Sequence, residues 1–166
     1  LPADLEATAD LGEATSEAAL VLVAVPTHGF RAVLEGSSAT LGAAVPVVSL
    51  AKGFERGSCL RMTEVVSELL PGRPVAVLTG PNLAKEVLEG RSSAAVVAAT
   101  DSAVSGVLQG LLASDRLRIY TNDDLVCCEI GGAVKYLIAL PAGMAECPHT
   151  VVHARPAPLP RGFAPL

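Results

Sequence analysis

The stretch LVLVAVPTHG at residues 20–29 decides the fold. Its first six residues are all apolar, with valine at every second position, and a proline, a histidine and a glycine follow. A short apolar run that ends in turn residues predicts a β-strand buried on both faces of a sheet. Three further runs of this kind are residues 47–51 (VVSLA), 75–78 (VAVL) and 94–99 (AAVVAA).

The segments between these runs have helical spacing. Residues 58–69 form one predicted helix, and its apolar face is Leu60, Met62, Val65, Val66 and Leu69. Asp101 is expected to cap the next helix, and the predicted buried stripe of that helix is Val104, Leu108, Leu111 and Leu112. Strands that alternate with helices form βαβ units. The sequence therefore predicts an α/β fold: a partial Rossmann-type, mostly parallel sheet with helices on both faces.

The alternation ends after an extended segment at residues 117–120. From residue 123 to about residue 144 we expect one longer helix, the start of an all-α domain. Residues 147–166 hold five of the 12 prolines and no acidic residue, which is typical of a divergent or disordered tail. The predicted domains are 1–122, 123–146 and 147–166.

Composition excludes several classes of protein. The formal net charge of −5 argues against binding to nucleic acid or to an anionic membrane. With 51% hydrophobic and 17% charged residues, the chain is too apolar to be disordered. The longest apolar run, residues 18–26, is about half of the roughly 18 residues that span a bilayer. We therefore expect no membrane span and no signal peptide, and the first residue, Leu1, predicts a chain that begins inside a longer protein.

The four cysteines form no CxxC pair, so reduced cytoplasmic thiols are expected. The spacing of Cys147, His149 and His153 is a weak metal pattern because it lacks a fourth ligand, and no metal is predicted.

Candidate ligand residues follow the strands, because open parallel sheets bind ligands beyond the carboxyl ends of their strands. Lys52 follows the second run, and Gly80 and Asn82 follow the third. A lysine there can meet a phosphate, although a solvated turn is the commoner role of such a residue. His28, after the first run, is expected to be a surface or capping residue.

Lys135 lies on the predicted long helix, four residues after Gly131 and three after Gly132. All three share one face of that helix, so a ligand could approach Lys135 across bare backbone. The alternative is that the glycines serve helix packing.

Five strings are more specific than a generic Rossmann pattern: VLVAVPTHGFR, VVSLAKGFERG, AVLTGPNLAKEV, LRIYTNDDLV and EIGGAVKYLIALPAGMAE. In order and approximate spacing, the chain resembles the bacterial NAD(P)-dependent glycerol-3-phosphate dehydrogenases over nearly all of residues 1–146. The most specific element is GPNLAKE followed by EIGGAVK.

The resemblance implies interconversion of sn-glycerol 3-phosphate and dihydroxyacetone phosphate by hydride transfer, with NADP or NAD as cofactor, to supply glycerophospholipid precursors. It assigns catalysis to Lys135. It further assigns substrate contacts to Lys52, Gly80, Asn82 and Lys135, and cofactor contacts to Phe30, Lys52 and Ala84. A lysine that accepts a proton needs its pKa lowered from about 10.4, and Lys52 is one possible positive neighbour.

Three departures from the family pattern predict a truncated chain that is inactive alone. The GxGxxG loop is absent, Tyr136 stands where the family usually has Asn, and the residues after Glu146 diverge. Two alternatives stay open: a non-catalytic Rossmann-like remnant or binding module, and another dehydrogenase of the superfamily that acts on a hydroxy acid. The choice between NAD and NADP and a homo-oligomeric state of the full-length enzyme also stay open.

Overall fold

The structure is a computed structural model, and it describes residues 5–81 and 84–145. Its elements are α1 (Leu11–Thr15), β1 (Val21–Val23), α2 (Thr27–Ser37), β2 (Val47–Ser49), α3 (Met62–Leu69), β3 (Val75–Thr79), α4 (Ala84–Leu88), β4 (Ser93–Ala99), α5 (Ser102–Leu112), β5 (Leu117–Asn122) and α6 (Leu125–Ala145). Every apolar run that was predicted to be a strand forms one.

The strands form one five-stranded sheet in the order β1-β2-β3-β4-β5. Strands β1, β2 and β3 are parallel, β3 and β4 are antiparallel, and β4 and β5 are parallel. The predicted mostly parallel sheet is confirmed, but the expected βαβ repeat is wrong at β4. The connection from β3 to β4 carries only α4, which buries no residue. It therefore lacks the packed helix that a parallel crossover normally uses.

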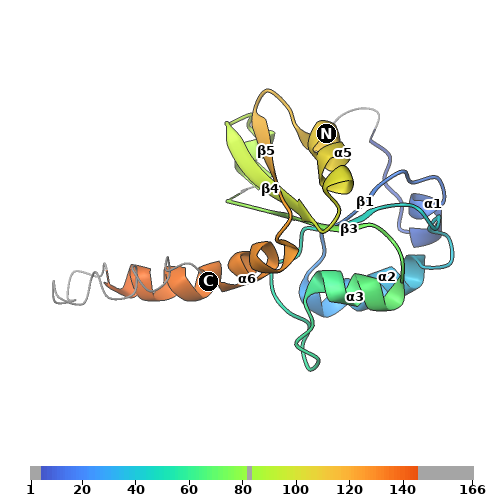
Figure 1. The fold of residues 1–166 in the computed structure, drawn as a ribbon, viewed down its shortest axis with the longest axis horizontal. Helices are drawn as coiled ribbons and strands as arrows, with labels where there is room; N and C mark the ends of the chain where they lie inside the picture. The colour runs from blue at the N-terminus through green and yellow to red at the C-terminus, as the bar shows by residue number, and fades with distance from the viewer. Residues whose placement is uncertain (1–4, 82–83, 146–166) are drawn as a thin grey trace.

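Two apolar cores lie on the two faces of the sheet, as alternate residues of β2 show. Val47 packs with α2 and α3, whereas Val48 packs with α5. Figure 1 shows α2 and α3 side by side on one side of the sheet and α5 on the other. The predicted helices on both faces are therefore present, and valine, leucine and alanine supply most of the core.

Two burial predictions are wrong, and both concern the β1 side of the molecule. Strand β1 lies at the sheet edge, and its Leu22 is 44% exposed, whereas all three residues of β2 are buried. Leu111, predicted to be buried, is 66% exposed. It lines an open apolar groove of about 240 Å³ with Leu20 and Pro46, which precede β1 and β2.

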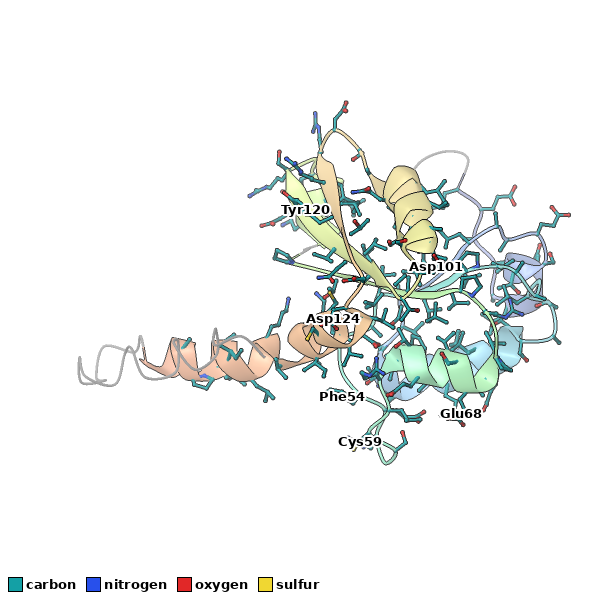
Figure 2. The ribbon with its side chains drawn as sticks, in the orientation of Figure 1. Phe54, Cys59, Glu68, Asp101, Tyr120 and Asp124 are labelled. Atoms are coloured by element: carbon teal, nitrogen blue, oxygen red, sulfur yellow. The ribbon has the colours of Figure 1, made fainter. Side chains whose placement is uncertain are left out.

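Helix α3 begins at Met62, later than predicted, because the preceding residues form a loop. Phe54 and Arg61 pair across this loop, and Cys59 has a positive φ of 59°. The backbone N–H of Arg61 donates to the Glu64 carboxylate at 2.8 Å, which fixes the first turn of α3. Phe54 and Cys59 lie on this loop, which projects from the body of the molecule (Figure 2).

Helix α6 starts where Asp124 accepts a hydrogen bond from the Cys127 N–H at 2.9 Å, and it extends away from the sheet (Figures 1 and 2). By length and composition alone it could cross a membrane, since Leu125–Ala142 has a mean hydropathy of 1.6. We expected no membrane span because no continuous apolar run in the sequence is long enough. In α6 two charged residues, Glu129 and Lys135, interrupt the apolar sequence, so a search for continuous runs does not find this helix. Both charged side chains contact the α/β domain, as described below. These contacts favour a helix that packs against the protein.

Candidate active site

The carboxyl ends of β1, β2 and β3 share one edge of the sheet because the three strands are parallel neighbours. The segments that leave this edge begin at Ala24, Leu50 and Gly80. This confirms the predicted common edge for the described residues. Asn82, the further residue expected there, lies outside the described part of the chain.

Lys52 connects two of these strand ends. Its Nζ donates a hydrogen bond to the carbonyl oxygen of Gly80 at 2.9 Å, so the side chain reaches from the end of β2 to the end of β3. Gly80 has a φ of +146°, a conformation that favours glycine, so the turn that presents this carbonyl depends on it.

Lys135 of α6 meets Lys52 at the same edge. The amine of Lys135 lies beside that of Lys52, and partial burial together with this neighbour lowers the pKa of Lys52 from its usual 10.5. Burial is the larger cause, and it acts by disfavouring the charged form. Lys52 and Lys135 therefore come together as expected, whereas Asn82, the third residue expected in this pocket, lies outside the described residues.

The two glycines before Lys135 have different surroundings. A Cβ on Gly132 would lie 2.8 Å from Oγ1 of Thr79 in β3 and 3.8 Å from Cγ of Lys52. A Cβ on Gly131 would meet nothing within 4 Å. Gly132 therefore allows α6 to pack closely on the end of β3, as the packing alternative predicted, whereas Gly131 faces open space.

Glu129, one turn before Gly132, is a functional candidate that the sequence reasoning missed. Its side chain is only 7% exposed. The carboxylate accepts hydrogen bonds from the Thr63 backbone N–H at 3.0 Å, from Arg61 Nη1 at 2.8 Å and from the Thr63 hydroxyl. The only signal in the sequence was a carboxylate within an apolar helix, because a buried carboxylate needs hydrogen-bond partners.

Comparison with known proteins decides the family. The profile described as NAD-dependent glycerol-3-phosphate dehydrogenase N-terminus matches residues 1–105. The chain belongs to this dehydrogenase family. It is 43% identical over 166 residues to a glycerol-3-phosphate dehydrogenase [NAD(P)+] of Sphingopyxis alaskensis, covering all of this chain and 50% of that protein. It is 47% identical over 140 residues to one from Mycobacterium avium, covering 84% of this chain and 41% of that protein.

A solved structure agrees with these relatives. The glycerol-3-phosphate dehydrogenase of Coxiella burnetii superposes with a TM-score of 0.87 at 32% identity, over 97% of this chain and 49% of that one. The described residues therefore share the fold of this dehydrogenase. The chain spans about half the length of the curated relatives it matches.

The remaining predicted site residues of this dehydrogenase chain lie in different surroundings. Ala84 is exposed at the start of α4. Phe30 is 0% exposed and packs in the core beside α3, so it has a structural role, and its contact with a cofactor stays a prediction. His28 is exposed, as expected of a surface residue. Cys147, His149 and His153 lie outside the described residues, and residues 5–81 and 84–145 hold no cluster of three or more metal-ligating side chains.

Proposed function

We propose that this chain is the part of an NAD(P)-dependent glycerol-3-phosphate dehydrogenase that carries the proton-transfer lysine and one wall of the substrate site. The observation that supports this is the meeting of Lys52 and Lys135 at the carboxyl edge of the sheet. Two amino groups at this edge attract an anion, and the substrate class carries a phosphate. Within the described residues Lys52 has no carboxylate partner that would neutralise it.

The two lysines divide the chemistry between them. Oxidation of an alcohol releases a hydride from carbon and a proton from the hydroxyl oxygen. Lys135 accepts the hydroxyl proton of glycerol 3-phosphate and returns it to the carbonyl oxygen of dihydroxyacetone phosphate in the reverse reaction. Lys52 holds the phosphate by charge, and Gly80 and Asn82 line the substrate.

The residues present fit the reacting end of NAD(P). When bound, this cofactor accepts the hydride. We propose that Lys52 contacts both cofactor and substrate, and that Ala84 and Phe30 also contact the cofactor. The sequence contains no GxGxxG loop, the usual cradle for a dinucleotide pyrophosphate, so its contacts are proposed only for the part of the cofactor near the sheet edge.

The domain assignment is part of the proposal. Residues 1–122 would form part of the cofactor-binding domain, and residues 123–146 would begin the helical substrate domain. We also propose a cytoplasmic location, because Cys59, Cys127 and Cys128, the described cysteines, are free thiols.

A chimera tests the function. In it, this sequence replaces the segment of the Sphingopyxis alaskensis dehydrogenase to which it aligns over 166 residues. The chimera should oxidise NADPH or NADH when dihydroxyacetone phosphate is added, as followed by nicotinamide absorbance. Lys52→Ala in the chimera should weaken binding of cofactor and substrate as well as turnover, because its role is electrostatic.

A folded chimera that binds the cofactor but reduces only other keto compounds would favour a dehydrogenase acting on a hydroxy acid. A folded chimera without turnover on any of them would favour a non-catalytic binding module. Either result would overturn the proposal.

A further inference from the structure

Helix α6 carries Lys135, but few of the contacts between α6 and the sheet fix the orientation of the helix. Gly132 allows close approach to Thr79, and Lys135 meets the flexible Lys52 side chain. Neither contact alone fixes the rotation of α6 about its axis. Glu129, by contrast, accepts three hydrogen bonds from two residues at the start of α3, Arg61 and Thr63.

These three bonds hold α6 against the start of α3. Two of them come from the backbone and hydroxyl of Thr63, in the first turn of α3, whose N–H groups have no partner within the helix. The third comes from Arg61, which also donates to Glu64 at 2.8 Å and is thereby held in place. Figure 1 shows the first turns of α6 below the sheet and to the left of α3, and α6 contacts β3 and β4.

Because Glu129 and Lys135 lie on the same helix, the contact of Glu129 with α3 also determines where Lys135 lies. Lys135 follows Glu129 by six residues, which is about 9 Å along the axis and about 120° around it. With Glu129 held at α3, the intervening turn brings Gly132 onto Thr79 and Lys135 onto Lys52. A change in the rotation of α6 at Glu129 would move the Lys135 amine away from the sheet edge.

We propose that Glu129 is a positioning residue, which locks α6 to the start of α3 and thereby sets Lys135 against Lys52. Its consequence for catalysis rests on the function proposed above, but the geometry does not. Removal of the carboxylate would leave Arg61 with Glu64 as its remaining carboxylate partner and would leave the Thr63 N–H and hydroxyl without their acceptor. Helix α6 would then be free to rotate.

Titration of the lysine side chains in the 166-residue chain tests this directly. The chain has three lysines, Lys52, Lys85 and Lys135, so ¹³C-lysine labelling gives few signals to assign. In the wild type the pKa of Lys52 should be lowered. In Glu129→Gln it should rise toward the ordinary lysine value of about 10.4, and nuclear Overhauser effects between Lys52 and Lys135 should disappear. Lys85, exposed on α4, is the internal reference.

Glu64→Gln is the matched control, because Glu64 pairs with the same Arg61 and forms no hydrogen bond with a described residue of α6. It should leave the titration of Lys52 unchanged. If Glu129→Gln fails to fold, Thr63→Val keeps the test decisive, since it removes one donor to Glu129 and should raise the pKa of Lys52 partway. Glu129→Asp keeps the charge and should restore part of the effect.

An unchanged Lys52 titration in a folded Glu129→Gln or Thr63→Val chain would overturn the proposal. So would an equal change in Glu64→Gln, because it would trace the effect to the stability of α3. The outcome is independent of turnover by the chimera, so a failure of the positioning role and a failure of the proposed function are distinguishable.

Discussion

Two cationic side chains near the carboxyl ends of β1 and β2 have opposite surroundings. Arg31 of α2 pairs with Glu55 at 2.7 Å and with Glu68 of α3 at 3.1 Å. Lys52, three residues before Glu55, has a second lysine as its charged neighbour. Glu68 lies on the outer side of α3 in Figure 2, away from the sheet edge.

In the first cluster the neighbours favour the charged form of Glu55, whereas in the lysine pair the surroundings disfavour the charged form of Lys52. Arg31 holds the pKa of the Glu55 carboxyl down at about 2, and the Ser58 hydroxyl adds a hydrogen bond. In the lysine pair, burial and the neighbouring amine work against the charge of Lys52. A cluster that satisfies its own charges contributes to structure, whereas two like charges held close together are typical of a ligand site. This contrast, rather than either residue type, distinguishes the candidate site.

The largest expected effect comes from removing the amine of Lys135. In the chimera, Lys135→Ala should lower turnover by about 10² to 10⁴, the usual contribution of a positioned proton-transfer group, with cofactor affinity nearly unchanged. Steady-state kinetics and cofactor titration measure both quantities.

Lys85→Ala, on the exposed surface of α4, is the control and should leave turnover near the parent value. Near-normal turnover in Lys135→Ala would remove the catalytic assignment and leave α6 as a packing helix.

Sequence reasoning predicted this site well where the signal was local. The apolar runs predicted the strands, and Asp101, which accepts a hydrogen bond from the Ala103 N–H at 2.8 Å, predicted the start of α5. The meeting of Lys52 and Lys135 followed from strand ends and helical spacing together with the resemblance to the dehydrogenase family. The reversal at β4 was missed because an apolar run carries no information on strand direction.

The role of Glu129 was missed for a different reason. Its partners lie 66 and 68 residues earlier in the chain, so no local pattern reports them. The exposure of Leu111 was missed because helical spacing gives the face of a helix, but not the extent of the sheet beneath it.

The second prediction concerns two adjacent glycines of α6, of which only Gly132 lies against the sheet. Gly132→Ala should destabilise the chain by about 1–3 kcal/mol, because its Cβ would lie 2.8 Å from Oγ1 of Thr79. Gly131→Ala should instead stabilise it by up to about 1 kcal/mol, since the new methyl group meets nothing and alanine favours helix. Urea unfolding measures both, and equal effects of the two substitutions would contradict the close packing of Gly132 on β3.

The third prediction uses the lysine pair at alkaline pH. The folded-state pKa of Lys52 lies below its unfolded value of 10.5, so the unfolded chain binds more protons between these values. The free energy of unfolding should therefore rise with pH as Lys52 loses its proton, and the penalty should be fully present below the folded-state pKa. Lys135→Gln should make this rise shallower and should stabilise the chain at neutral pH by about 0.5 kcal/mol or less, because solvent screens the pair.

Urea unfolding from neutral pH to about pH 10.5 measures this slope, with Lys85→Gln as the control. The burial contribution should remain in Lys135→Gln. An identical slope in wild type and Lys135→Gln would show that the two amines do not interact in solution.

The smallest expected effect concerns the ion pair of Arg31 and Glu55, and it is measured at acidic pH. The pKa of Glu55 falls from its usual 4.5 to about 2 on folding. A depressed carboxyl pKa contributes stability that is full above about pH 4.5 and is lost as the pH falls toward about 2. The difference in melting temperature between wild type and Glu55→Gln should therefore shrink over this window, with Glu35→Gln, exposed on α2, following the wild type. Because Arg31 and Glu55 lie near the surface, salt should weaken the same difference at neutral pH. A difference that persists unchanged at pH 2 would mean that Glu55 acts through packing and not through its charge, and the contrast between the two clusters would then rest on Lys52 and Lys135 alone.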